Sequence, residues 1–325
     1  MKIHELLNEA ISLTQFKTPL HNAIVDTLLN TTKKLYYTKQ LIAPEVEADI
    51  AKHGNLHEHL YPYMTRRLIF LSVQSLSDTI KKEIHTYTKI SSHITFKELN
   101  DEGYGGYASG LDITLNSTII SKLAKEILDY CFEHALNSLE GGEADLVPSL
   151  LRVFKNIEAR DIIEHSDYLI RKLVSTVIHE LVHVIQHSKQ QHRPQTAYRS
   201  YLTRDKRKFY EAINRMHQGT HDTADYRLYR GSPQEIAAFA HEEALKLIND
   251  TNMSDADENE LAYIKKHLPS YMQGYTGNMF SDPTNDREYK IFKRFNKIVY
   301  QEVSSYLDKL IATAAEQKKQ QPAEY

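Results

Sequence analysis

The sequence is poor in cysteine, glycine and proline, and it contains no long apolar run. Its single cysteine, Cys131, excludes a disulfide framework and a cysteine-based zinc site, and we expect a small buried hydrophobic side chain there. Because 11 glycines and 9 prolines in 325 residues are well below average usage, long helices are expected. No apolar stretch approaches the roughly 18 residues of a transmembrane helix, so no membrane partner is expected.

The sequence also lacks a large excess of positive or negative charge. The 40 Lys and Arg residues against 43 Asp and Glu residues give a net charge of -3, which provides no overall field for attracting nucleic acid. The basic segment at 204–208 has acidic residues close by, which favours a solvated helix face over a nucleic-acid patch. The first ten residues lack the apolar core of a secretory signal. A cytoplasmic location is therefore expected, and a nucleic-acid partner is not.

The period of the apolar residues differs from a helical one in one segment of the chain. From 1 to about 88 they return every three or four positions, which predicts helices. Apolar and polar residues instead alternate at 111–116, and together with 94–99 this predicts a small antiparallel sheet with a turn near Ser109 and Gly110. Further helices are expected at 118–139, 148–160, 166–187, 232–248 and 289–315.

These patterns define the expected fold class and organisation. We expect an α+β fold that is mostly helical, with a small antiparallel or mixed sheet before the helix at 166–187. The expected parts are a helical N-terminal portion (1–90), a core (91–250) and a helical C-terminal portion (251–325) that ends in a frayed tail.

The segment 174–187 carries the clearest chemical signal, because His179, Glu180 and His183 form the pattern H-E-x-x-H. Residues four apart on a helix share one face and lie about 6 Å apart along the axis. Two imidazoles can then converge on one zinc ion, which takes nitrogen ligands at about 2.0 to 2.1 Å. Glu180, next to the first histidine, can reach a water at the metal, and its expected role is general base.

The flanks of this motif are apolar on most sides, which predicts a buried helix. Burying two histidines and a glutamate without partners costs several kcal/mol. A metal ion would satisfy them together. The alternative is a pair of core histidines, His179 and His183, that hydrogen-bond to backbone or carboxylate groups.

With its apolar flanks, the H-E-x-x-H segment resembles the active-site helix of the zincin metallopeptidases. The preceding hairpin is similar to the strands before that helix in the superfamily, where an edge strand pairs with the substrate backbone. The resemblance covers about 94–247 and implies a zincin-like catalytic core within 91–250. The residues that it implies for substrate binding are Gly105, Gly106, Tyr107 and Ala108. An ordinary glycine-assisted hairpin is the alternative explanation of that segment.

A third metal ligand is needed. His187 continues the histidine stripe, but it lies about 12 Å along the axis from His179 and cannot share its metal. Position 189 is Lys, which excludes the elongated metzincin pattern. The resemblance to gluzincins, whose third ligand is a glutamate on a later helix, implies Glu235 in an alanine-rich segment.

Glu235 has an alternative explanation, because Ser232 and Glu235 have the spacing of a helix-capping box. The alternative third ligands are Glu242, Glu243, His241, His221 and Asp222. A donor for the tetrahedral oxyanion is also needed. Its candidates, among which the sequence does not choose, are Tyr226, Tyr229, His221 and His241.

The first ten residues contain Leu7-Asn8-Glu9 followed by Ala10. They resemble the peptides that target internal head proteins into the proheads of large tailed bacteriophages. The resemblance implies cleavage before Ala10 and a virion-associated location, whereas an ordinary amphipathic helix explains the same residues.

Together these features predict a zinc-dependent metallopeptidase that acts on a peptide or protein substrate. Zinc would be held by His179, His183 and Glu235, with Glu180 as general base and a fourth position open for water. The alternative is a non-catalytic structural or virion-packaged interaction protein that keeps the fold. The sequence leaves open the substrate, endo- versus exopeptidase action and the oligomeric state.

Overall fold

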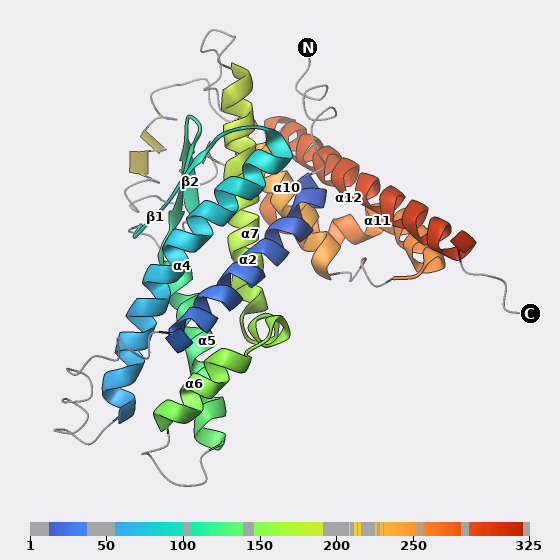
Figure 1. The fold of residues 1–325 in the computed structure, drawn as a ribbon. Coiled ribbons are helices and arrows are strands. Elements are labelled where there is room, and N and C mark those ends of the chain that lie inside the picture. Colours follow the sequence, from blue (N-terminus) through green and yellow to red (C-terminus); the bar gives the residue numbers. More distant parts are fainter. Residues whose placement is uncertain are drawn as a thin grey trace, which may run out of the picture. The chain divides into compact units, whose positions relative to one another are not determined.

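A computed structural model shows a mostly helical chain with one small sheet (Figure 1). The ranges that it describes are 13–37, 56–99, 105–138, 146–190, 231–250, 256–280 and 286–320, with some single positions between 208 and 253. Within them the α+β class expected from the sequence is confirmed. The first ten residues, with the expected cleavage site, lie outside the described residues.

The chain divides into two compact units. Unit 1 comprises Met1–Lys17, Ala108–Leu111 and Ser175–Tyr325, and unit 2 comprises Thr18–Tyr107 and Asp112–Val174. Each unit is described by itself below. The division into 1–90, 91–250 and 251–325 remains a prediction.

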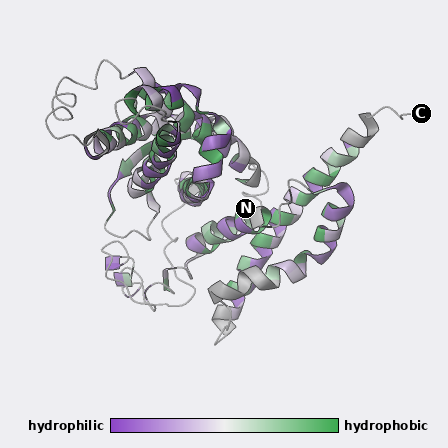
Figure 2. Cartoon of the chain, turned by 90° about the horizontal axis from the view of Figure 1, so that it is seen from below, coloured by the Kyte–Doolittle hydropathy of each residue, from purple (hydrophilic) through white to green (hydrophobic). Residues whose placement is uncertain are grey.

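Unit 2 is built from helices around a three-stranded sheet. Its helices are α2 (Leu13–Tyr37), α4 (Leu56–Thr88), α5 (Thr118–Asn137), α6 (Leu146–Asn156) and the first half of α7 (Ala159–Gln190). Helix α4 packs against α5 and strand β1, and α5 packs against α6. The buried residues of α4 include Leu68, Leu76 and Ile80, which follow the helical period of the sequence. Figure 2 shows hydrophobic and hydrophilic residues interspersed along the helices of the chain.

The sheet contains β1 (His93–Lys97), β2 (Gly106–Ser109) and β3 (Asp112–Asn116) in the order β1-β3-β2. A tight turn joins β2 to β3, and Gly110 adopts a φ of +66° there, a conformation that glycine adopts without strain. Strand β1 pairs with β3 in parallel, from His93 opposite Asp112 to Lys97 opposite Asn116. The wholly antiparallel arrangement is therefore wrong and the mixed one is right, because β3 lies between β1 and β2.

Thr114 and Asn116 on the polar face of β3 are also buried, whereas Asp112 is exposed, although the alternating pattern is typical of a strand with one solvated face. The hydroxyl of Thr114 lies 3.2 Å from that of Thr95 on β1. Asn116 Oδ1 accepts a hydrogen bond from the backbone N–H of Thr118 at 3.1 Å, at the start of α5. These bonds give each of the two buried polar side chains a partner within the chain.

Helix α7 begins seven residues before the expected start at Ser166, which is 1% exposed inside the helix. The start is fixed instead by Asp161, whose carboxylate accepts the backbone N–H of Glu158 at 2.8 Å. That contact is the returning half of a capping box. The expected start was wrong because a serine inside a helix resembles an N-cap in sequence.

The elements that the structure describes in unit 1 include the second half of α7, the hairpin tip and three long helices. These are α10 (Pro233–Asp250), α11 (Glu258–Phe280) and α12 (Asp286–Gln320). Helix α12 packs against both α10 and α11. The expected helices at 232–248 and 289–315 correspond to α10 and α12, whereas α11 lies in the expected helical C-terminal portion but was not delimited as a helix.

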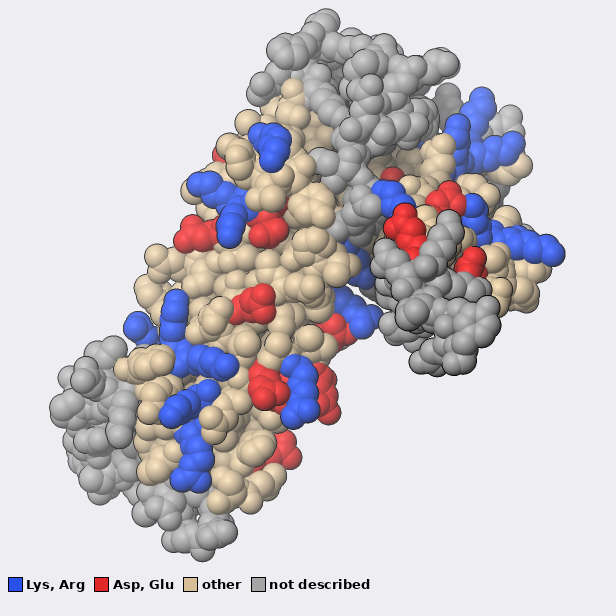
Figure 3. Space-filling view, turned by 45° about the vertical axis from the view of Figure 1, so that its right-hand side comes forward, with Lys and Arg blue, Asp and Glu red and all other residues tan. Residues whose placement is uncertain are grey.

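No described helix combines the length and the apolar character needed to cross a membrane. On the face shown in Figure 3, basic and acidic side chains lie among one another. This mixture agrees with the net charge of -3.

Candidate metal centre

Helix α7 presents His179 and His183 on one face, as their spacing requires. Their ring centroids lie 5.1 Å apart with the planes at 70°. The neighbouring helix residues Ile178, Leu181 and Val182 are buried. The apolar flanks that predicted a buried helix therefore do bury it, and both imidazoles lie at its buried side.

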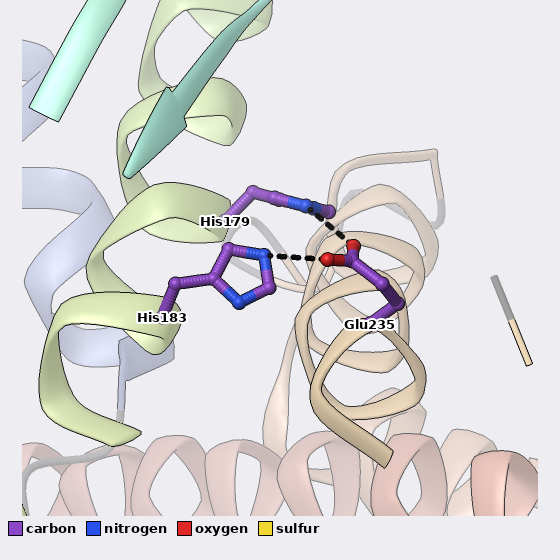
Figure 4. A group of neighbouring side chains, drawn as sticks. All are labelled: His179, His183 and Glu235. Carbon is purple, nitrogen blue, oxygen red and sulfur yellow. Dashed lines mark ion pairs between the residues drawn. The ribbon is translucent and has the colours of Figure 1, made fainter. Parts of the chain in front are cut away.

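Glu235, in the first turn of α10, directs its carboxylate at both imidazoles (Figure 4). Glu235 Oε2 lies 3.4 Å from His179 Nε2, and Oε1 lies 3.3 Å from His183 Nε2. One donor atom of each residue lies within 4.8 Å of the donor atoms of the other two. The three predicted ligands thus come together, although they are far apart in sequence.

The donor set fits a zinc ion. Two imidazole nitrogens and one carboxylate oxygen are ligands that catalytic zinc takes, with a further position left for water or substrate. Glu235 is 6% exposed, and its Oε2 atom makes no hydrogen bond of normal geometry with a described residue. A buried carboxylate oxygen of this kind is costly without a partner, and a cation between it and the imidazoles would supply one.

The two explanations of Glu235, metal ligand and capping box, each agree with part of the structure. Its backbone N–H donates to Ser232 Oγ at 3.3 Å, so Ser232 caps α10. The second half of a capping box is absent, because the Ser232 N–H donates to the carbonyl of Tyr229 at 3.0 Å. The Glu235 carboxylate therefore does not bind the Ser232 N–H, and it faces the two histidines instead.

The charges of the three triad residues strongly affect one another's pKa values. Burial acts to lower the pKa of both histidines, but the neighbouring carboxylates outweigh burial and raise the pKa of His179 to about 10 and that of His183 as well. Burial acts to raise the pKa of Glu235, yet the two histidines hold it well below its usual range. A metal ion would have to displace the protons that these imidazoles hold.

Glu180 is 4% exposed beside the triad. Burial raises the pKa of its carboxyl group, while the charges of His179 and His183 act in the opposite direction. The backbone of Ala108 in β2 hydrogen-bonds to the Glu180 carboxylate. The expected general base is therefore buried, oriented by the hairpin and next to the first histidine.

The segment expected to bind substrate lies at an edge of the sheet, since among the described strands β2 pairs with β3 alone. Asn116 N–H donates to the carbonyl of Gly105 at 2.8 Å, so Gly105 faces β3. Because backbone direction alternates along a strand, Gly106 and Ala108 turn their N–H and C=O groups away from β3. Tyr107 again faces β3. Substrate pairing at this edge remains a prediction.

Several other candidates from the sequence lie outside the triad in the part of the chain that the structure describes. His187 is exposed, and its ring lies near Gly110 at the hairpin turn. Glu243 bonds Lys246 at 3.3 Å. His241 is buried with its Nδ1 atom 3.7 Å from Glu302 on α12. The candidate ligands His221 and Asp222 and the candidate oxyanion donor Tyr226 lie outside the described residues, and Tyr229, another candidate donor, is half-buried before α10.

One contact was not expected. His179 Nδ1 lies 3.5 Å from Glu242 Oε2, so Glu242 faces the outer side of the imidazole rather than the centre of the triad. The sequence had offered Glu242 only as a replacement for Glu235. Its spacing from Glu235, nearly two helical turns, was the available signal that both can lie on one face.

No protein-family model, curated protein or solved structure matches the chain significantly. The chemistry of the site therefore carries the functional proposal.

Proposed function

We propose that this chain is a metal-dependent hydrolase. The observation that carries the proposal is the convergence of His179, His183 and Glu235 beside the buried carboxyl of Glu180. Within that class, the site best fits a zinc metallopeptidase of the zincin type, with an edge strand beside the H-E-x-x-H helix. Its substrate would be a peptide or protein.

Each residue has a distinct role in this proposal. A zinc ion bound by the triad would supply a Lewis acid for a peptide carbonyl and would acidify water. Glu180 accepts the proton of the attacking water and later returns it to the leaving amine. The raised pKa of Glu180 suits this exchange, because a general base works best with a pKa close to the working pH.

The hairpin would hold the substrate. A peptide that adds to the outer edge of β2 would pair with the outward backbone groups of Gly106 and with the carbonyl of Ala108. The Ala108 backbone also orients Glu180, so the same residue would connect substrate placement to the general base. A virion-associated location is part of the proposal only if the N-terminal peptide is cleaved before Ala10.

The test combines metal analysis with an unbiased digest of a peptide library. We expect about one zinc per chain, peptide cleavage by the zinc-loaded protein, and loss of cleavage after chelation that zinc restores. Stoichiometric zinc without cleavage of any peptide would support the non-catalytic structural alternative. Absence of bound zinc at saturating concentration would overturn the proposed metal site.

A further inference from the structure

The two ring nitrogens of His179 face two different carboxylates of one helix. His179 Nε2 lies 3.4 Å from Glu235 Oε2, and His179 Nδ1 lies 3.5 Å from Glu242 Oε2. Glu235 and Glu242 are seven residues apart on α10, which brings them to within about 20° of the same helix face. One face of α10 therefore reaches the imidazole from both sides.

The shared centre of the triad identifies the nitrogen that faces the metal. His183 also uses Nε2 to approach Glu235, at 3.3 Å, so both Nε2 atoms surround the same carboxylate. A neutral imidazole carries one proton, and its other nitrogen is the metal ligand. If Nε2 of His179 bound a metal at the centre of the triad, the proton of the neutral imidazole would be on Nδ1. Glu242 could then accept a hydrogen bond from that N–H.

Glu242 differs from Glu235 in its surroundings. The side chain of Glu235 is 8% exposed, whereas that of Glu242 is 36% exposed. Glu242 is therefore at the rim of the site, on the side of His179 that faces away from the triad. Phe239, also on α10, contacts the His179 ring edge-on, with centroids 4.7 Å apart. His183 has no second carboxylate partner among the described residues.

We propose that Glu242 is a positioning residue that accepts the Nδ1–H of His179 and so fixes its tautomer and ring orientation for metal binding. The proposal rests on the metal site proposed above. Partners of this kind raise the basicity of a ligating histidine, and their loss typically costs about 10- to 100-fold in metal affinity. Helix α10 would then supply both a metal ligand and the carboxylate that orients another ligand.

The experiment measures the zinc affinity of Glu242→Ala by competition with a chromophoric chelator. Glu243→Ala is the matched control, because Glu243 is the next residue of the same helix and bonds Lys246. We expect Glu242→Ala to bind one zinc with about 10- to 100-fold lower affinity. Glu243→Ala should stay within about twofold of the wild type. Circular dichroism of each variant checks that it folds.

A spectroscopic measurement separates positioning from general loosening. In zinc-loaded protein labelled with ¹⁵N-histidine, His179 should show an Nδ1–H proton that is protected from exchange. Glu242→Ala should lose that protection, and Glu242→Asp should restore part of it together with part of the affinity. Glu243→Ala should leave the signal unchanged.

The outcomes distinguish this proposal from the proposed function. If Glu242→Ala binds zinc as tightly as the wild type while Glu235→Gln does not, the positioning role is wrong and the metal site stands. If Glu242→Ala loses stoichiometric zinc outright, Glu242 is a ligand and the positioning role is again wrong. If the wild type binds no zinc, both proposals fail. None of these measurements depends on peptidase activity.

Discussion

His183 Nε2 lies 3.3 Å from Glu235 Oε1, which joins the H-E-x-x-H helix to the first turn of α10. The backbone N–H of Glu235 is meanwhile bound to Ser232 Oγ at 3.3 Å. The cap fixes where the helix begins, and the side chain is left to reach the histidines. Cap and ligand are thus separate functions of neighbouring atoms, and two substitutions can separate them.

Glu235→Gln should sharply weaken zinc binding, because a neutral amide replaces an anionic oxygen ligand. Ser232→Ala should instead lower the free energy of unfolding by about 0.5 to 2 kcal/mol through loss of the cap, and should keep stoichiometric zinc. Metal analysis and thermal unfolding of both variants check this pair. Full zinc affinity in Glu235→Gln would exclude Glu235 as a ligand.

Glu180→Gln should retain zinc and lose peptidase activity by roughly 10²- to 10⁴-fold, the usual contribution of a positioned general base. Gln keeps the shape of the side chain but cannot accept the proton. Turnover of a peptide cleaved by the wild type is the measurement, and Glu164→Gln, at an exposed position of the same helix, is the control. Equal turnover by Glu180→Gln and the wild type would contradict the role.

The part of the site that sequence could predict is local. His179, Glu180 and His183 lie on one helix, so their relative positions follow from helix geometry alone. Glu235 was accessible through the resemblance to gluzincins, whose third ligand is a glutamate on a later helix, and not through helix geometry. The contact between Glu242 and His179 was not accessible, because it depends on how α10 is placed against α7.

In the fold as well, local features could be predicted from the sequence and long-range features could not. Alternating residues predicted the strands, but whether β1 joins β3 in parallel is decided by chain topology and not by a local pattern. Helix α11 did carry a local signal that was missed. Asp257 Oδ1 accepts the N–H groups of Asn259 and Glu260 at 2.8 and 2.9 Å, and Glu260 returns to the Asp257 N–H at 3.1 Å. This is a complete capping box.

Gly106→Ala should destabilise the hairpin. A Cβ atom at Gly106 would lie 2.6 Å from the carbonyl oxygen of Thr114, a backbone atom that cannot move without disturbing β3. We expect a loss of about 1 to 3 kcal/mol in unfolding free energy, as for other overpacked sites. Thermal unfolding measures it. Gly110→Asn is the control, since Asn tolerates the positive φ of that turn, and equal stability of the two variants would argue against the close contact.

Glu302 provides a test of pH dependence in unit 1. Its Oε1 atom lies 3.7 Å from His241 Nδ1, and its side chain is 20% exposed. Burial raises the pKa of Glu302 from 4.5 to about 7, with Lys309 acting in the opposite direction. Burial lowers the pKa of His241 to about 4, and the charge of His179 adds to that effect.

The sign of the Glu302 effect follows from proton binding. Between its unfolded and folded pKa values the folded state binds more protons than the unfolded state, so this group makes stability fall as pH rises from 4.5 to about 7. The cost then persists at higher pH. His241 acts oppositely, because its unfolded state binds more protons between about 4 and 6.5.

Glu302→Gln removes the glutamate cost and leaves His241 in place. The variant should therefore gain stability over the wild type, and the gain should be larger at pH 8 than at pH 5, by about 2 kcal/mol. Thermal unfolding at the two pH values measures the difference. Glu316→Gln, at an exposed position of the same helix, should show no such difference. A gain for Glu302→Gln that is equal at both pH values would mean that Glu302 ionises as readily in the folded chain as in the unfolded one.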